Sequence, residues 1–309
     1  MLDPKDIFPI GIGTWGIGGY LLKEPAIDHY KQEKALIHML NSGMNFVEAN
    51  AWYSEGQSVE TLSKALKNSN KKRNEAFICQ AVYVKDGKFE NVESEVEKVM
   101  KLFDTDYIDT FQFTTSVFTN FGFDKCIKLV DKLISNKTIR YTSITNENKS
   151  LLKRYKEYFG DKLFSHEVSY TFENRENEID NNGPINYANQ NNIKTIVYQP
   201  LRRNRTALRN WPLLVELSNK YAVTQNQILL AWIVSKGFLP LTKSETISHI
   251  DEHIASLNIK LSNEDLQRLE DFRIQNYQVP QIDWYKTGNS LDVSQLPNVF
   301  DEEYDKQNK

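Results

Sequence analysis

The sequence contains few cysteines and histidines, and neither residue type follows a metal-binding or disulfide pattern. Among 309 residues there are two cysteines, Cys79 and Cys126, and both lie in apolar sequence (FICQAV and DKCIKLV). No CxxC pair occurs, and the five histidines show no zinc-ligand spacing. We therefore expect no metal site and two buried, reduced thiols, as is typical of a cytoplasmic protein.

Long apolar runs and an excess of one charge are also missing. The longest apolar run, 228–234, is far too short to span a bilayer, and the opening MLDPKDIFPI lacks the features of a secretory signal. Lys plus Arg total 38 and Asp plus Glu total 41, which gives a net charge of −3. A nucleic-acid partner would require a concentrated basic face. These absences predict a cytoplasmic chain with no membrane or nucleic-acid partner, and they leave its oligomeric state open.

The sequence does contain a regular alternation of strand-like and helix-like segments. Eight segments read as strands: 8–14, 45–49, 76–82, 107–113, 139–145, 167–170, 195–199 and 238–241. Helical periodicity lies between most of them, at 31–41, 59–67, 92–103, 124–133, 149–158, 211–221 and 225–235. Such alternation predicts an α/β fold with a parallel sheet, and eight units favour a (β/α)8 TIM barrel. An open doubly wound sheet is the alternative, although no helix pattern directly follows GIGTWGIGG, as a dinucleotide-binding glycine motif requires.

We assign residues 1–273 to a single barrel domain and 274–309 to a C-terminal tail. The tail contains spaced apolar side chains that are expected to pack on the barrel or on a partner subunit: Trp284, Tyr285, Leu291, Leu296 and Phe300. Before the seventh strand, the polar stretch 173–184 (ENRENEIDNNGP) predicts a surface loop.

Five blocks of the sequence, in order, resemble the aldo-keto reductase family. They are GIGTWGIGGY, SGMNFVEANAWYSEGQSVETLSKAL, IRYTSITN, IVYQPL and LLAWIVSKGFLPLTKS, and they lie within residues 8–272. Members of this family are (β/α)8 barrels that bind NADP(H) and reduce aldehydes and ketones with an Asp, Tyr, Lys and His tetrad. The resemblance therefore implies an NADP(H)-dependent oxidoreductase with a small, carbonyl-containing substrate.

The catalytic tetrad is altered in this chain. The family block NFIDTAxxYG reads NFVEANAWYS, which puts Glu48 at the Asp position and Tyr53 at the Tyr position. The lysine position holds Ala81, or Gln80 if the register slips by one residue, and the histidine position holds Thr114. A phenol needs a nearby cation to act as an acid at neutral pH, so the loss of lysine predicts atypical or reduced chemistry. Glu48, without its cation, should bind a proton or another partner.

Several interpretations of this altered site stay open. Lys85, on the loop after the third strand, could supply the missing cation, although a solvated position is the simpler expectation. The chain could instead be a non-catalytic barrel that binds a nucleotide or metabolite. It could also be a lyase or isomerase that uses Glu48 and Tyr53 without net redox chemistry.

The resemblance also implies residues for the nicotinamide end of NADP(H). Tyr198 in IVYQPL matches the aromatic residue that stacks under the nicotinamide ring. Thr145 and Asn146 match the pair that binds the carboxamide, and Glu167 stands where the family has a glutamine.

Further positions match the phosphate and adenosine contacts. Lys243 and Ser244 match the pair that receives the 2′-phosphate, while His249 and His253 stand where the family has an Arg and an adenine-contacting Asn. The basic loop LRRNR, which wraps the pyrophosphate in the family, supplies Leu201, Arg202, Arg203 and Arg205; its arginines suit phosphate contacts or a solvated loop. The substrate pocket is expected to be lined by four side chains at strand ends: Trp15, Trp52, Ala81 and Thr114.

Overall fold

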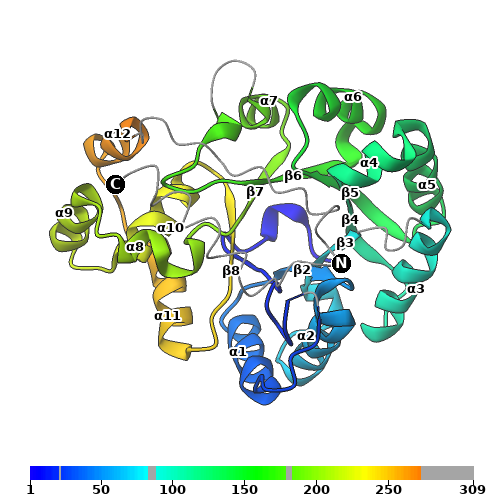
Figure 1. Ribbon diagram of the computed structural model, residues 1–309, viewed down its shortest axis with the longest axis horizontal. Coiled ribbons are helices and arrows are strands. Elements are labelled where there is room, and N and C mark those ends of the chain that lie inside the picture. Colours follow the sequence, from blue (N-terminus) through cyan, green and yellow to red (C-terminus); the bar gives the residue numbers. More distant parts are fainter. Residues whose placement is uncertain (21, 83–87, 179–182, 273–309) are drawn as a thin grey trace.

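Eight parallel strands close into a barrel in the computed structural model, which describes residues 1–20, 22–82, 88–178 and 183–272 (Figure 1). Each strand pairs with the next, and the last pairs with the first, so the sheet has no edge. The strands are β1 Gly11–Ile12, β2 Phe46–Asn50, β3 Phe77–Val82, β4 Ile108–Thr114, β5 Ile139–Thr145, β6 Leu163–Ser169, β7 Lys194–Tyr198 and β8 Leu239–Thr242. The predicted (β/α)8 barrel is confirmed, and the open sheet was the wrong alternative.

Helices surround the barrel and cover its outer face (Figure 1). Seven follow the predicted periodicity: α1 His29–Asn41, α2 Gln57–Asn68, α3 Val92–Leu102, α5 Phe123–Ser135, α6 Lys149–Phe159, α9 Pro212–Tyr221 and α10 Gln225–Ser235. Five were not predicted: α4 Thr115–Phe121, α7 Pro184–Gln190, α8 Arg205–Leu208, α11 Ile247–Ala255 and α12 Asn263–Asp271. These helices have at most nine residues, so few apolar positions repeat within them. Within the described ranges, no helix has the length and apolarity needed to cross a membrane.

Alternation along the strands decides which side chains face the barrel interior. Phe46, Phe77 and Cys79 belong to an interior cluster with Phe164, whereas Ile78 packs in the larger core between sheet and helices. The aromatic rings stack near the amino-terminal ends of the strands, and the ring centroids of Phe46 and Phe77 are 5.8 Å apart. Since side chains two residues apart share a face, the residues that follow on the same strands line the interior toward its carboxyl end.

Three predicted segments need correction. The first strand was expected at 8–14, but β1 comprises Gly11–Ile12 alone. The sixth strand was expected at 167–170, but it begins at Leu163, because the polar Ser165 and His166 within it are buried and interrupt its apolar pattern. The stretch 173–184 was expected to be a surface loop, but Glu173 and Arg175 are buried. Their charges are paired with other parts of the chain, which is what makes their burial possible.

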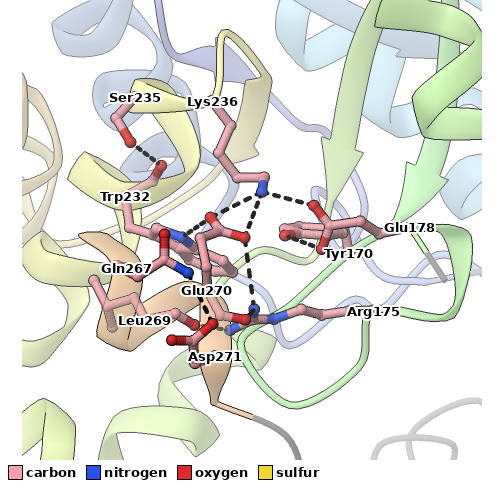
Figure 2. Close-up of polar contacts among 10 residues, drawn as sticks. All are labelled: Tyr170, Arg175, Glu178, Trp232, Ser235, Lys236, Gln267, Leu269, Glu270 and Asp271. Atoms are coloured by element: carbon pink, nitrogen blue, oxygen red, sulfur yellow. Dashed lines mark hydrogen bonds and ion pairs between the residues drawn. The ribbon is translucent and has the colours of Figure 1, made fainter. Parts of the chain in front are cut away.

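A polar clamp ties the segment after β6 to α10 and α12 (Figure 2). Lys236 forms ion pairs with Glu178 at 2.6 Å and with Glu270 at 2.8 Å, and the Trp232 indole donates to Glu270 Oε1 at 2.7 Å. Arg175 donates to the Glu270 backbone carbonyl at 2.9 Å. The clamp therefore fixes the last described helix to the barrel. The tail predicted at 274–309, like Lys85, lies outside the described residues.

Candidate active site

Tyr53 and Glu48 form a buried hydrogen-bonded pair at the carboxyl end of β2. The Tyr53 hydroxyl donates to Glu48 Oε1 at 2.9 Å, and the two residues are 8% and 5% exposed. The turn that brings Tyr53 back over the strand has positive φ angles at Ser54 and Glu55, and the Ser54 hydroxyl donates to the Ile17 carbonyl at 2.7 Å. The half-buried Trp15 ring packs edge-on against Tyr53, with centroids 4.7 Å apart. The structure thus brings together three residues that were predicted for one site.

The next two strands place Ala81 and Thr114 near this pair. Ala81 shares the inner face of β3 with Phe77 and Cys79, whereas Gln80 has the opposite orientation, so the strand presents Ala81 to the interior. The register aligns Asn50, Ala81 and Gln112 in one row across β2, β3 and β4. Thr114, 6% exposed, ends β4 on the same inner face as Gln112.

A second buried carboxyl group, Glu167 on β6, lies close enough to Glu48 to interact with it electrostatically. Gln112 Nε2 donates to Glu167 Oε2 at 2.8 Å, and the Cys79 thiol donates to Gln112 Oε1 at 3.7 Å. Burial raises the pKa of Glu48, and burial together with repulsion from Glu48 raises the pKa of Glu167 to about 8. Among the described residues, no Lys or Arg forms an ion pair with either carboxyl group. Burial therefore favours the protonated form of both carboxyl groups, and Glu167 holds its proton at neutral pH.

The four residues predicted for the nicotinamide end meet at the carboxyl ends of β5, β6 and β7. The Thr145 hydroxyl donates to the Glu167 backbone carbonyl at 3.1 Å, and the Asn146 backbone N–H donates to the same oxygen at 2.8 Å. The Tyr198 hydroxyl donates to Asn146 Oδ1 at 3.0 Å. Burial raises the pKa of Tyr198 to about 12, so its hydroxyl stays protonated as a donor.

Two cations lie on the rim beside the glycine-containing loop that follows β1. The Lys243 ammonium donates to the Gly16 carbonyl at 3.2 Å and lies 3.9 Å from Glu245, and Arg203 donates to the Tyr20 hydroxyl at 2.7 Å. Burial lowers the pKa of Lys243, Glu245 opposes that shift, and Arg203 adds to it. Arg203 therefore lies close enough to Lys243 for the two positive charges to repel each other.

Other predicted nucleotide contacts are spread between exposed and buried positions. Ser244 lies in the segment between β8 and α11, where its hydroxyl accepts from the Thr246 backbone N–H at 3.0 Å, and His249 is exposed on α11. His253 is 7% exposed, and burial lowers its pKa to about 4. Leu201 is buried after β7.

Arg202 does not fit the expected role in phosphate contacts. It forms an ion pair with the buried Glu173, which also accepts from Arg209 at 3.1 Å and from the Trp211 indole at 2.8 Å. Arg202 therefore compensates an internal charge, and Arg203 is the exposed arginine of the loop.

Three residues of this region were not predicted from the sequence. Gln112 and Asn50 lie on the inner face, and the polar–aromatic alternation TFQFT could have indicated Gln112. Gln32 on α1 accepts from the Gly18 backbone N–H at 2.8 Å and donates to Glu245 Oε1 at 2.8 Å. It joins the glycine-containing loop to the Lys243 segment, and no local pattern in the sequence indicates this long-range contact.

Comparisons with known proteins agree with this architecture. The model of the aldo/keto reductase family matches residues 9–274. Methylglyoxal reductase YeaE from Escherichia coli is 24% identical over 266 residues, which cover 84% of this chain and 89% of that protein. A crystal structure of the thermostable aldo-keto reductase Tm1743 with the inhibitor epalrestat has a TM-score of 0.75 at 24% identity, covering 85% of this chain and 94% of that one. An aldo/keto reductase from Klebsiella pneumoniae, crystallised with NADP and acetate, has a TM-score of 0.72 at 22% identity over 85% of this chain and 90% of that one. With the family model spanning most of the barrel, this chain belongs to the aldo/keto reductase family.

Proposed function

We propose that this chain is an NADP(H)-dependent oxidoreductase that reduces small carbonyl compounds at the carboxyl end of the barrel. The observation that carries the proposal is the 2.9 Å hydrogen bond between Tyr53 and Glu48, which places a proton donor where barrel enzymes have their active sites. Family membership supports it, as do the E. coli relative named as a methylglyoxal reductase and the K. pneumoniae structure with NADP. The cytoplasmic setting that we propose rests on the free, buried Cys79 and Cys126.

The side chains on the rim fit the chemistry of NADP(H). Lys243 and Arg203 are like charges held near each other, so an anionic phosphate between them would relieve their repulsion and gain charge-assisted hydrogen bonds. Tyr198 and Asn146 form a hydrogen-bonded platform at the strand ends where the nicotinamide would lie. When bound, NADPH supplies the hydride.

Glu48 and Tyr53 would supply the proton. With Glu48 ionised, the hydroxyl proton of Tyr53 is engaged in the bond to the carboxylate. With Glu48 protonated, its own proton can be donated to the Tyr53 oxygen, and the phenolic proton is free for the carbonyl oxygen of the substrate. Burial raises the pKa of Glu48 and so favours this second state. The proton passes from Tyr53 to the substrate oxygen and from Glu48 to Tyr53, and the carboxylate is then reprotonated from solvent.

The remaining site residues are proposed to bind and enclose the reactants. Four would line the substrate side of the site: Trp15, Trp52, Ala81 and Thr114. Seven would contact the nucleotide besides Tyr198 and Asn146: Thr145, Leu201, Arg203, Lys243, Ser244, His249 and His253. Glu167, which is expected at the nicotinamide end, has its carboxyl group bonded to Gln112 in the interior and would lie between the nucleotide and the substrate. Of the nucleotide contacts, the buried His253 can offer only a small part of its ring to a ligand.

Fluorescence titration with NADPH and NADH, run beside a panel of carbonyl substrates that includes methylglyoxal, tests the proposal. We expect NADPH to bind and Tyr53→Phe to lower kcat by about 100-fold or more with unchanged NADPH affinity, because general acid catalysis contributes about that much. Tyr158→Phe, which removes an exposed hydroxyl bonded to Asp131, is the matched control and should leave turnover unchanged.

The same experiment separates the other interpretations. NADPH binding with no turnover on any carbonyl would indicate a non-catalytic nucleotide-binding barrel. Absence of binding of either nucleotide at about millimolar concentration would refute the proposal and favour non-redox chemistry at Glu48 and Tyr53.

A further inference from the structure

The barrel interior offers more hydrogen-bond acceptors than its described residues satisfy. The Glu48 carboxyl group accepts hydrogen bonds from the Tyr53 hydroxyl and the Thr14 backbone N–H. Among the described residues, the Glu167 carboxyl group accepts one, from the Gln112 amide to Oε2. Glu167 Oε1 therefore accepts no hydrogen bond from a described side chain or backbone group. Ala81, in the row between Asn50 and Gln112, contributes a methyl group and no charge. The carboxyl pair is thus suited to a cation that the described part of the chain does not supply.

An unsatisfied donor lies on the same inner face. Asn50 is fully buried, and its Oδ1 accepts from the Trp52 backbone N–H at 3.0 Å, which orients the amide. Within the described part of the chain, its Nδ2 has no hydrogen-bond partner. Asn50 follows Glu48 by two residues on β2 and pairs with Ala81 in the register, so it points to the interior beside the carboxyl groups. A buried donor without a partner is costly, and a ligand oxygen at this position would satisfy it.

We propose that the substrates of this reductase are small carbonyl compounds that also carry a protonated amine, with the ammonium group bound by Glu167 beside Glu48 and the carbonyl oxygen by Tyr53 and Asn50. This inference rests on the proposed function, because it names the substrate class for the same site. The substrate itself then brings the positive charge that Ala81 lacks.

The physical basis is the cost of an uncompensated carboxylate inside the barrel. In the free protein that cost is avoided by protonation, which leaves Glu167 a neutral acid with a weak preference for neutral ligands. An ammonium group beside Glu167 stabilises its carboxylate, and a charge-assisted hydrogen bond in a buried setting is stronger than a neutral one. Repulsion from the Glu167 carboxylate favours the protonated form of Glu48, so the pair retains one proton and gains one cation. A hydroxyl group in place of the ammonium provides no such compensation.

Aminoacetone and hydroxyacetone test this directly, since they differ in an ammonium and a hydroxyl group of similar size. At about pH 6.5, where an α-amino group is largely protonated, we expect kcat/KM to be at least about tenfold higher for aminoacetone. Glu167→Gln, which preserves the side-chain shape and an acceptor for Gln112, should abolish that preference. Glu93→Gln, which removes a surface carboxylate paired with Lys132, is the control and should leave it unchanged.

A binding measurement keeps the inference separate from the redox activity. Calorimetry with isopropanolamine and propylene glycol, the alcohols that these reductions would form, should show tighter binding of the amine by about tenfold or more, and Glu167→Gln should remove the difference. Equal binding of both alcohols, together with equal turnover of both ketones and normal NADPH affinity, would overturn this inference and leave the reductase proposal standing. Selective amine binding that depends on Glu167, without turnover of any carbonyl, would support the cation site while refuting the reductase proposal.

Discussion

Replacing Glu167 with glutamine should make the protein more stable at alkaline pH. Burial raises the pKa of Glu167 from its ordinary value of 4.5 to about 8, so between these values the folded protein holds a proton that the unfolded chain releases. Stability therefore falls as pH rises through this window, by about 1.4 kcal/mol per pH unit for one such group. Over the whole window the loss reaches up to about 5 kcal/mol. Glu167→Gln has no such proton to lose.

The comparison of the two proteins isolates this group from other titrations. His166 and His253 are also buried, with pKa values lowered by burial to about 3 and about 4. Those histidines make stability rise with pH up to their unfolded pKa of about 6.5, in both proteins alike. The free-energy difference between Glu167→Gln and wild type therefore reports the Glu167 carboxyl group together with its electrostatic coupling to Glu48.

Urea denaturation at several values from about pH 5 to about pH 8.5 measures that difference. Near pH 5 the two proteins should be within about 1 kcal/mol, because the neutral acid and the amide make similar hydrogen bonds with Gln112. Toward pH 8.5 the variant should become more stable by at least about 2 kcal/mol. The surface variant Glu93→Gln should follow the wild-type curve within about 0.5 kcal/mol. Parallel curves for Glu167→Gln and wild type would refute the reasoning, since they would mean that Glu167 is charged and compensated in the folded state.

Two further substitutions test the rim and the clamp. Lys243→Ala should weaken NADP(H) binding by about ten- to a hundredfold while changing NAD(H) affinity by less than about threefold, because the lost ammonium meets the 2′-phosphate; equal losses in a fluorescence titration would contradict that assignment. Glu270→Gln should lower the free energy of unfolding by about 1–3 kcal/mol, since Lys236 and Trp232 lose a shared carboxylate acceptor. Glu157→Gln, in an exposed pair with Lys153, should change it by less than about 0.5 kcal/mol in the same urea assay, and an equal effect of both variants would show that the clamp does not stabilise the fold.

The strand pattern could be predicted from the sequence because each strand is short, apolar and separated from the next by a helix with clear periodicity. The exceptions have two separate causes. In β6 the buried polar residues Ser165 and His166 conceal the first half of the strand, and α11 and α12 are too short for a strong periodic pattern.

The candidate site could be predicted only where its residues are local to one another. Glu48 and Tyr53 are five residues apart, and their hydrogen bond follows from one strand end and its turn. The contact between Gln112 and Glu167 depends on the register and closure of the barrel, which period-two alternation alone does not specify. Gln32 shows the same limit, because its partner Glu245 lies 213 positions away.

The last prediction distinguishes a decayed reductase site from one adapted to another substrate. Glu48→Asp, Ala81→Lys and Thr114→His together would restore the family tetrad around Tyr53. Because the barrel fixes the strand ends, the restored groups in a decayed site should align, and reduction of the neutral hydroxyacetone should rise by at least about tenfold, or about 1.4 kcal/mol of transition-state stabilisation.

We expect no such gain. The new lysine would lie in the row between Asn50 and Gln112. Its charge would pair with Glu167 and disturb the hydrogen bond that the Gln112 amide now donates to Glu167. It would also repel an ammonium-bearing substrate, so the triple variant should bind NADPH normally and lose its preference for aminoacetone without gaining activity on hydroxyacetone. Three changes in the tetrad within an otherwise well-packed barrel favour adaptation, since undirected decay should have damaged the core as well. A tenfold gain in the reduction of hydroxyacetone by the triple variant would show instead that the pocket still fits the original tetrad. Glu48, Ala81 and Thr114 would then mark the loss of catalytic residues and not an adaptation.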